Sequence, residues 1–302
     1  MTNEAKHIPV LLHDVFQALQ VKKDDVIVDA TFGAGGYTKA FLEKGVRVFA
    51  FDRDPNAIKN GEKLVTAFTG QLNLIHAPFS QMQNELNARD IDHVDAIVFD
   101  LGVSSMQIDE AERGFSFRHD GPLDMRMSSE GKSAADIVNT YDEEDIANIL
   151  YQFGEEKKSR MIARAIVARR KEKSFTQTLE LAQLIEKTIG RRPQDKIHPA
   201  TRSFQGLRIA VNDELDEIEK ALQTASGLLR SGGRLAVVTF HSLEDRIVKQ
   251  FLAKKRSGSR HVPETWLAKD EWQASKLITP NEMEISANPR ARSAKLRVAT
   301  KI

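Results

Sequence analysis

Three aspartates in the first hundred residues end β-branched, apolar runs of the chain: Asp29, Asp52 and Asp100. A cluster of glycines at residues 33–36 follows the first of them, and a helical pattern comes next. The order strand, glycine turn, helix is typical of an open α/β sheet, in which nucleotide-like ligands bind at the carboxyl ends of strands. Glycines let the backbone approach a ligand, and a carboxylate about 20 residues farther along suits a ribose. The alternative is a tight turn that binds nothing.

The glycine pattern departs from the dinucleotide fingerprint, because Thr38 occupies the third glycine position of G-x-G-x-x-G when Gly33 is the first. Asp29 and Asp52 at strand ends favour S-adenosylmethionine instead, since that molecule has no pyrophosphate and carries a cationic amino acid end. We predict S-adenosylmethionine as the ligand. We expect no metal, because no cluster of His, Asp and Glu has the spacing of a metal site.

Alternating strands and helices must position these residues. Strands are expected at residues 26–28, 46–51, 72–75 and 94–100. Helices are expected at residues 10–19, 38–44, 54–68 and 80–89, the last with Ser80 as its cap. This alternation predicts a parallel sheet covered by helices.

The alternation stops after Gly102, and residues 105–205 contain no convincing strand. Residues 111–126 read as a loop, and helices are expected at 143–153, 155–173 and 176–189, the first with Thr140 and Glu143 as a capping box. A helical stretch of this length inside an α/β repeat predicts an inserted domain.

The α/β pattern then resumes. One or two helices are expected at 199–229, a strand at 234–240, a helix at 242–254 capped by Ser242, a mobile polar loop at 255–271 and a strand at 293–300. Strands that follow the fifth one near the end of the chain are more typical of a methyltransferase sheet than of a dehydrogenase sheet.

Composition limits the class of protein. Apolar residues make up 41%, charged residues 29%, the net charge is +1, and cysteine is absent, so disulfides and thiolate metal sites are excluded. We expect a cytoplasmic protein, because residues 1–7 have no signal core and no run could span a membrane. Residues 154–208 hold 14 Lys/Arg against 6 Asp/Glu, and residues 289–302 hold five basic residues and no acid. These regions are either solvated faces or a phosphate-binding surface.

Nine segments, in order along nearly the whole chain, resemble one family, the bacterial 16S ribosomal RNA cytosine-N4 methyltransferases. They are His7-Ile-Pro-Val-Leu-Leu12, Asp29-Ala-Thr-Phe-Gly-Ala-Gly-Gly36, Asp52-Arg-Asp-Pro55, Asp100-Leu-Gly-Val-Ser-Ser105, Glu112-Arg-Gly-Phe-Ser-Phe117, Asp120-Gly-Pro-Leu-Asp-Met-Arg-Met127, His198-Pro-Ala-Thr-Arg202, Phe240-His-Ser-Leu-Glu-Asp-Arg246 and Asn288-Pro-Arg-Ala-Arg-Ser293. One such segment is a weak signal, but nine together are specific.

The resemblance implies an α/β fold, a Rossmann-like class I methyltransferase sheet interrupted by an all-helical inserted domain. Residues 1–106 and 206–302 would form the catalytic domain that binds S-adenosylmethionine, and residues 107–205 a helical substrate-binding insert. The implied activity is methyl transfer to N4 of a cytosine in the decoding region. The implied partner is 16S ribosomal RNA or the small ribosomal subunit. Whether the enzyme is a monomer or a homodimer stays open from the sequence.

The resemblance also implies cofactor-binding residues. Gly35, Gly36 and Tyr37 would line the methionine end of S-adenosylmethionine, Tyr37 through its backbone because its position often holds His. Asp52 would bind the ribose, and Phe79 would lie against the adenine.

Asp100 and Gln107 would close the same pocket. Asp100 is also the predicted acceptor for the cytosine amine, because it ends the fourth strand beside the expected cofactor methyl group. Related DNA amino-methyltransferases follow this acid with Pro-Pro-Tyr, whereas here Leu-Gly-Val follows. The aromatic that stacks on the base therefore stays open between Phe115 and Phe117, with insert core as the alternative for both.

Two other functions remain open from the sequence. One is a non-catalytic ribosomal RNA-binding or assembly factor with a vestigial pocket, although intact Asp29, Gly35, Asp52 and Asp100 argue against decay. The other is a nicotinamide-dependent oxidoreductase, against which the missing third glycine argues. His241 is expected to be structural, and residues 255–283 receive no role.

Overall fold

The computed structural model describes residues 9–191, 194–195, 197–253 and 272–302. The chain forms two compact units, the first made of residues 1–102 and 215–302 and the second of residues 103–214. The boundaries expected after residues 106 and 205 lie inside helices α5 (Ser105–Asp109) and α10 (Thr201–Asn212).

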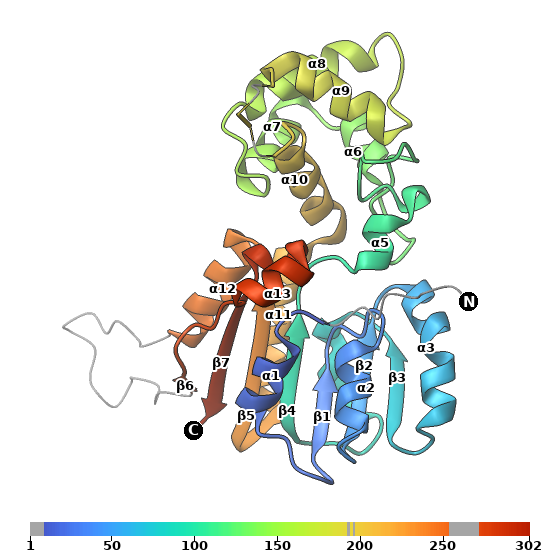
Figure 1. Cartoon of the computed structure of the whole chain (residues 1–302). Coiled ribbons are helices and arrows are strands. Elements are labelled where there is room, and N and C mark those ends of the chain that lie inside the picture. The colour runs from blue at the N-terminus through green and yellow to red at the C-terminus, as the bar shows by residue number, and fades with distance from the viewer. Residues whose placement is uncertain (1–8, 192–193, 196, 254–271) are drawn as a thin grey trace, which may run out of the picture. The chain divides into compact units, whose positions relative to one another are not determined.

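The first unit is built on a seven-stranded sheet in the order β3-β2-β1-β4-β5-β7-β6 (Figure 1). Its strands are β1 Val26–Asp29, β2 Arg47–Asp52, β3 Leu72–His76, β4 Val94–Asp100, β5 Leu229–Thr239, β6 Trp272–Ala274 and β7 Lys295–Lys301. The first five are parallel, and β7 runs antiparallel to both of its neighbours. This topology confirms the predicted Rossmann-like methyltransferase sheet with late strands. The three-residue strand β6 falls where the sequence suggested no element.

Both faces of the sheet are covered, because its strands bury alternate side chains on opposite sides. Ile27 packs into one core and Val28 into the other. The first core is completed by helices α1 Leu12–Leu19, α2 Gly36–Leu42 and α3 Pro55–Ala67. The second is completed by α4 Met82–Asn87, α11 Glu214–Leu228 and α12 Ser242–Leu252. Continuous apolar runs in the strands follow from this double burial.

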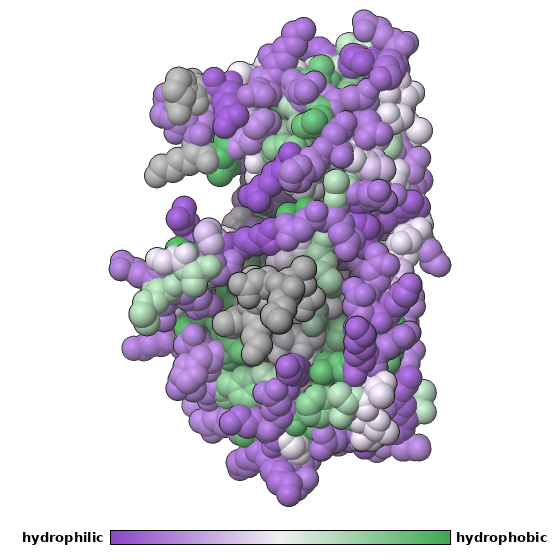
Figure 2. Space-filling view, turned by 45° about the vertical axis from the view of Figure 1, so that its right-hand side comes forward, coloured by the Kyte–Doolittle hydropathy of each residue, from purple (hydrophilic) through white to green (hydrophobic). Residues whose placement is uncertain are grey.

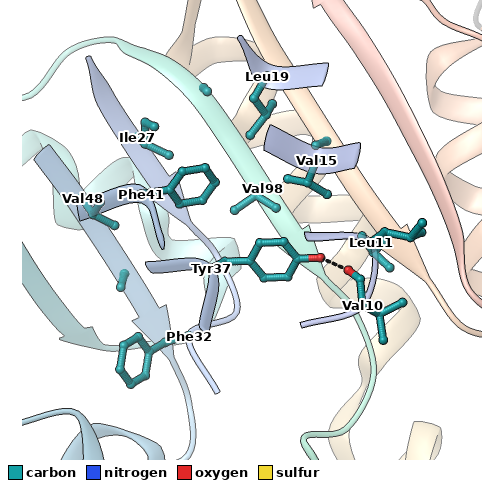
Figure 3. Packing of buried hydrophobic residues seen from close by; sticks show 14 of the residues in the cluster. Val10, Leu11, Val15, Leu19, Ile27, Phe32, Tyr37, Phe41, Val48 and Val98 are labelled. Carbon is teal, nitrogen blue, oxygen red and sulfur yellow. Dashed lines mark hydrogen bonds between the residues drawn. The ribbon is translucent and has the colours of Figure 1, made fainter. Parts of the chain in front are cut away.

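The N-terminal helix packs on the first core through Val15 and Leu19 (Figure 3). The ring of Phe16 stacks on that of Phe41 with centroids 4.7 Å apart. The hydroxyl of Tyr37 donates a hydrogen bond to the carbonyl of Val10. Tyr37 therefore points into the core, and its side chain is 3% exposed.

The second unit has its own apolar core, formed by helices. These are α6 Ala134–Thr140, α7 Glu143–Gln152, α8 Ser159–Arg170, α9 Thr178–Ile189 and α10. The unit also contains α5 and a 3-10 turn η2 at Ala111–Arg113. The expected capping box at Thr140 is wrong, because Thr140 ends α6 and its hydroxyl donates to the Asp136 carbonyl at 2.7 Å. The N-cap of α7 is Asp142.

Two other expected caps are also wrong. Ser80 lies within a 3-10 turn, η1 (Phe79–Gln81), and its hydroxyl donates to Glu217 at 3.1 Å. Ser242 is the first residue of α12, and His241 is the N-cap. Near the C-terminus the structure adds α13 Glu282–Ala287 and the turn η4 Pro289–Ser293. The loop expected at 255–271 lies outside the described residues.

The surface is mainly hydrophilic on the face drawn in Figure 2, where hydrophobic residues show as smaller areas. Among the described helices, none combines the length and the apolar character needed to cross a bilayer.

Candidate active site

The three aspartates of the sequence analysis lie at the same edge of the first unit's sheet. Asp29, Asp52 and Asp100 end β1, β2 and β4, which are parallel and adjacent. Because the chain continues from β1 toward β2 on one side and enters β4 on the other, the boundary between β1 and β4 is the topological switch point of the sheet. In open α/β sheets, ligands bind in the crevice outside the strand ends at this point.

Asp29 is fully buried and supports the glycine turn. Its carboxylate accepts hydrogen bonds from the hydroxyl of Thr38 at 2.6 Å and the backbone N–H of Thr31 at 3.2 Å. Burial nevertheless raises the pKa of Asp29 to about 6. Thr38, which breaks the dinucleotide fingerprint, thus fastens α2 to the end of β1. The sequence pattern gives no sign of this contact.

Asp52 is held by backbone donors. One oxygen accepts from the N–H of Gly33 and the other from that of Asp54, both at 2.8 Å. Burial raises its pKa, and these hydrogen bonds oppose the rise. Each carboxylate oxygen can accept a second hydrogen bond. Asp52 is therefore oriented in advance and keeps acceptor capacity for a diol.

Asp100 has a different environment. Its backbone N–H donates to the hydroxyl oxygen of Thr31 at 2.7 Å, but its buried side-chain Oδ1 has no hydrogen-bond partner among the described residues. Burial raises its pKa to about 8, with further contributions from the charges of Asp29 and Glu244. A buried acceptor without a donor costs free energy. This oxygen therefore fits a ligand that brings either a donor or a positive charge.

The glycine turn is constrained by packing. A Cβ on Gly35, which has a φ of +76°, would lie 2.8 Å from the ring of Phe32, and one on Gly36 would lie 2.3 Å from Pro9. Packing alone thus requires glycine at both positions. Because the side chain of Tyr37 enters the core (Figure 3), only its backbone is left to contact a ligand.

The two remaining cofactor candidates differ in location. Phe79 is half-buried in η1, and its ring meets that of Phe99 edge-on at 5.6 Å. Gln107 belongs to the second unit, where its side-chain oxygen accepts from the N–H of Ser104 at 3.0 Å and its own N–H donates to the Ser104 hydroxyl at 3.2 Å. This capping box explains Gln107 structurally.

Phe117 packs inside the second unit, with its ring centroid 4.7 Å from those of Phe204 and His198. Phe115 is partly buried against the same core and has the guanidinium of Arg113 5.6 Å from its ring centroid. These contacts favour the core interpretation for both phenylalanines.

Glu244 is a buried residue that the sequence analysis did not identify. It is 0% exposed, and its Oε2 accepts from the N–H groups of Phe240 at 2.7 Å and His241 at 3.2 Å. Its Oε1 lies 2.9 Å from Nε2 of His241. A capping box with His241 in the cap position was the available signal. Glu244 matters because its charge raises the pKa of Asp100.

Known proteins with similar sequences point to one family. The model of the MraW methylase family matches residues 4–302. A protein of Mesorhizobium japonicum is 54% identical over 298 residues, covering 97% of this chain and 87% of the relative. A protein of Caulobacter vibrioides is 54% identical over 304 residues, covering 98% of this chain and 96% of the relative. Both relatives are named "Ribosomal RNA small subunit methyltransferase H".

The predicted family and the predicted methyl donor are therefore confirmed, and the oxidoreductase alternative is not supported. With this sheet, this arrangement of aspartates and this similarity, the chain belongs to the MraW methylase family of S-adenosylmethionine-dependent methyltransferases.

Proposed function

We propose that this enzyme methylates the exocyclic N4 amine of a cytosine in the decoding, P-site region of 16S ribosomal RNA. The names of the relatives support the RNA substrate. The observation that supports the amine is the unpartnered, buried Oδ1 of Asp100 at the switch point of the sheet. The RNA or the small ribosomal subunit is the partner, and we expect the reaction in the cytoplasm.

The amine requires assistance because its lone pair is delocalised into the cytosine ring. Asp100 accepts an N4 hydrogen, which increases electron density on nitrogen and then takes up the positive charge that develops as the methyl group arrives. S-adenosylmethionine supplies the electrophilic methyl group. Asp52 holds its ribose, the backbone of residues 35–37 lines its methionine end, and Phe79 lies against its adenine.

The second unit supplies the RNA-binding surface in this proposal. Lys157, Arg160 and Lys171 lie on α8 or directly beside its ends, are exposed, and have no ion-pair partner in the described part of the chain. Exposed cations of this kind bind phosphates. The C-terminal basic run is less suitable. Lys295 and Arg297 there both bind Asp245, at 3.0 and 2.7 Å.

Substitution of Asp100 tests the chemical role. Single-turnover methyl transfer is measured for Asp100→Asn and Asp100→Ala at saturating cofactor and RNA, with both affinities determined separately. Asn keeps an acceptor oxygen and should retain partial activity, whereas Ala should slow the chemical step on the order of a hundredfold. If Ala weakens only cofactor affinity and reacts at the normal rate when saturated, Asp100 is not the amine acceptor.

A further inference from the structure

Three buried carboxylates come together at the switch point, and the reaction assigned above uses the charge of only one. Asp29 ends β1, Asp100 ends β4, and Glu244 lies in the first turn of α12. No ion pair to Asp100 occurs within the described residues. Asp100 is therefore a buried carboxyl group in this cluster that has no cation paired with it in the described part of the chain.

Backbone contacts hold the three groups near one another. Thr31 links two of them, because its N–H donates to Asp29 while its hydroxyl oxygen accepts from the N–H of Asp100. Gly102, which follows β4 and has a φ of +97°, lies near the third. A Cβ there would lie 3.8 Å from Oε1 of Glu244. Like charges in a poorly solvated place disfavour each other's ionisation.

Donors distinguish the three carboxylates. Asp29 accepts from Thr38 and Thr31, and Glu244 accepts from two backbone N–H groups. Oδ1 of Asp100 has no such donor. Asp100 is therefore the member that stays protonated when no ligand is bound, in agreement with a pKa raised to about 8 by burial, Asp29 and Glu244.

We propose that the sulfonium charge of S-adenosylmethionine ionises Asp100, so that cofactor binding expels the proton of this carboxyl group and prepares the base that the amine requires. The inference rests on the proposed function, which places the cofactor methyl group beside Asp100. The protein would thus hold an active base only while a methyl donor is present.

The charges balance through the reaction. When the cofactor binds, the proton of Asp100 leaves to solvent and the carboxylate faces a sulfonium. The N4 lone pair then forms the N–C bond, and the electron pair of the C–S bond goes to sulfur. Asp100 takes the proton released by N4. The products are a neutral thioether, a neutral methylated cytosine and a neutral Asp100 carboxyl group. Protonated Asp100 is the favoured form once the sulfonium charge has gone.

Other titratable groups near Asp100 do not replace it as the source of the proton. Tyr37, on α2, has a pKa well above its usual value because of burial, so it stays neutral. His241, at the start of α12, has its Nε2 2.9 Å from Oε1 of Glu244. Asp29, with a pKa of about 6, is already mainly ionised at pH 7.

Calorimetric titration with S-adenosylmethionine and with S-adenosylhomocysteine tests the proposal directly, because the two share every titratable group and differ in the sulfonium. Titration in buffers of different ionisation enthalpy gives the number of protons released. At pH 7 we expect about 0.9 more protons released with S-adenosylmethionine, and almost no difference at pH 9.5. Its affinity should rise about tenfold from pH 7 to pH 9, while that of S-adenosylhomocysteine should not.

Two variants identify the group. Asp100→Asn should still bind S-adenosylmethionine but lose the extra proton release and the rise of affinity with pH. Asp92→Asn changes an exposed aspartate of the same unit and should behave as wild type. Equal proton release by wild type with both ligands would overturn the inference and leave the proposed function intact. Failure of S-adenosylmethionine to bind would overturn the cofactor assignment itself.

Discussion

Individual carboxylates at the sheet edge have separable tasks, and Asp52 gives the simplest test. Its two oxygens are oriented by the N–H groups of Gly33 and Asp54. Replacement by Ala would leave the ribose hydroxyls unpaired, so Asp52→Ala should weaken S-adenosylmethionine binding by about 1–3 kcal/mol. Calorimetry measures the change, and an unchanged dissociation constant would refute the ribose assignment.

Asp100 should reduce the stability of the ligand-free protein at alkaline pH. Its pKa is about 8 in the folded chain against an ordinary 3.8, so the folded state binds more protons. The contribution of Asp100 to the free energy of unfolding is fully present below about pH 4 and is lost as the pH rises through 8.

Asp100→Asn should consequently raise the melting temperature of the ligand-free protein more at pH 9 than at pH 5, by roughly 2–4 °C for each kcal/mol of stability regained. Thermal unfolding at both pH values measures this, with the exposed Asp92→Asn as the control. The same increment at both pH values would show that Asp100 is not protonated in the fold.

The sequence identified the aspartates because each follows a long apolar run, and parallel strands must end at one edge. The capping pattern at the start of α12 could point to Glu244 but could not show its burial, which depends on the packing of α12 against strands distant in sequence. The sequence also could not show that Thr38 donates a hydrogen bond to Asp29. In the G-x-G-x-x-G pattern, Thr38 is only a position where a glycine is missing.

Among the elements, α8 carries the clearest expectation about RNA. Lys157→Gln, Arg160→Gln and Lys171→Gln combined should weaken RNA binding and reduce the slope of log affinity against log salt by about 2, since each lost phosphate contact contributes about 0.7. Cofactor affinity should not change, because these residues belong to the second unit.

The matched control is Lys22→Gln, Lys23→Gln and Lys44→Gln, which removes three exposed cations from the loops before β1 and β2. These loops lie at the amino edge of the sheet, away from the aspartates. Equal salt slopes for the two triple variants would show that α8 makes no special contact with phosphate.

Element prediction succeeded where apolar periodicity was strong and failed where local capping patterns competed. The strand ending at Asp100 was placed correctly because seven consecutive residues suit a doubly buried strand. Thr140 and Ser242 both fit cap patterns. In the structure the N-caps of these helices are Asp142 and His241 instead, because tertiary packing decides where each helix begins. Trp272–Ala274 is too short for periodicity to reveal, and its pairing with β7 creates the strand.

At the scale of the whole molecule, family membership and the sheet agree on methyl transfer, and the remaining question is which atom receives the methyl group. Asp100 suits a nucleophile that must lose a proton, because its Oδ1 lacks another donor in the described chain. An exocyclic amine is such a nucleophile.

Mass spectrometry of 16S ribosomal RNA from cells lacking this protein is the most direct test of that assignment. The account predicts the loss of one methyl group from N4 of a cytosine in the P-site region. The wild-type gene should restore it, and a gene encoding Asp100→Ala should not. An unchanged methylation pattern, or the loss of a methyl group from another atom, would contradict the proposed function.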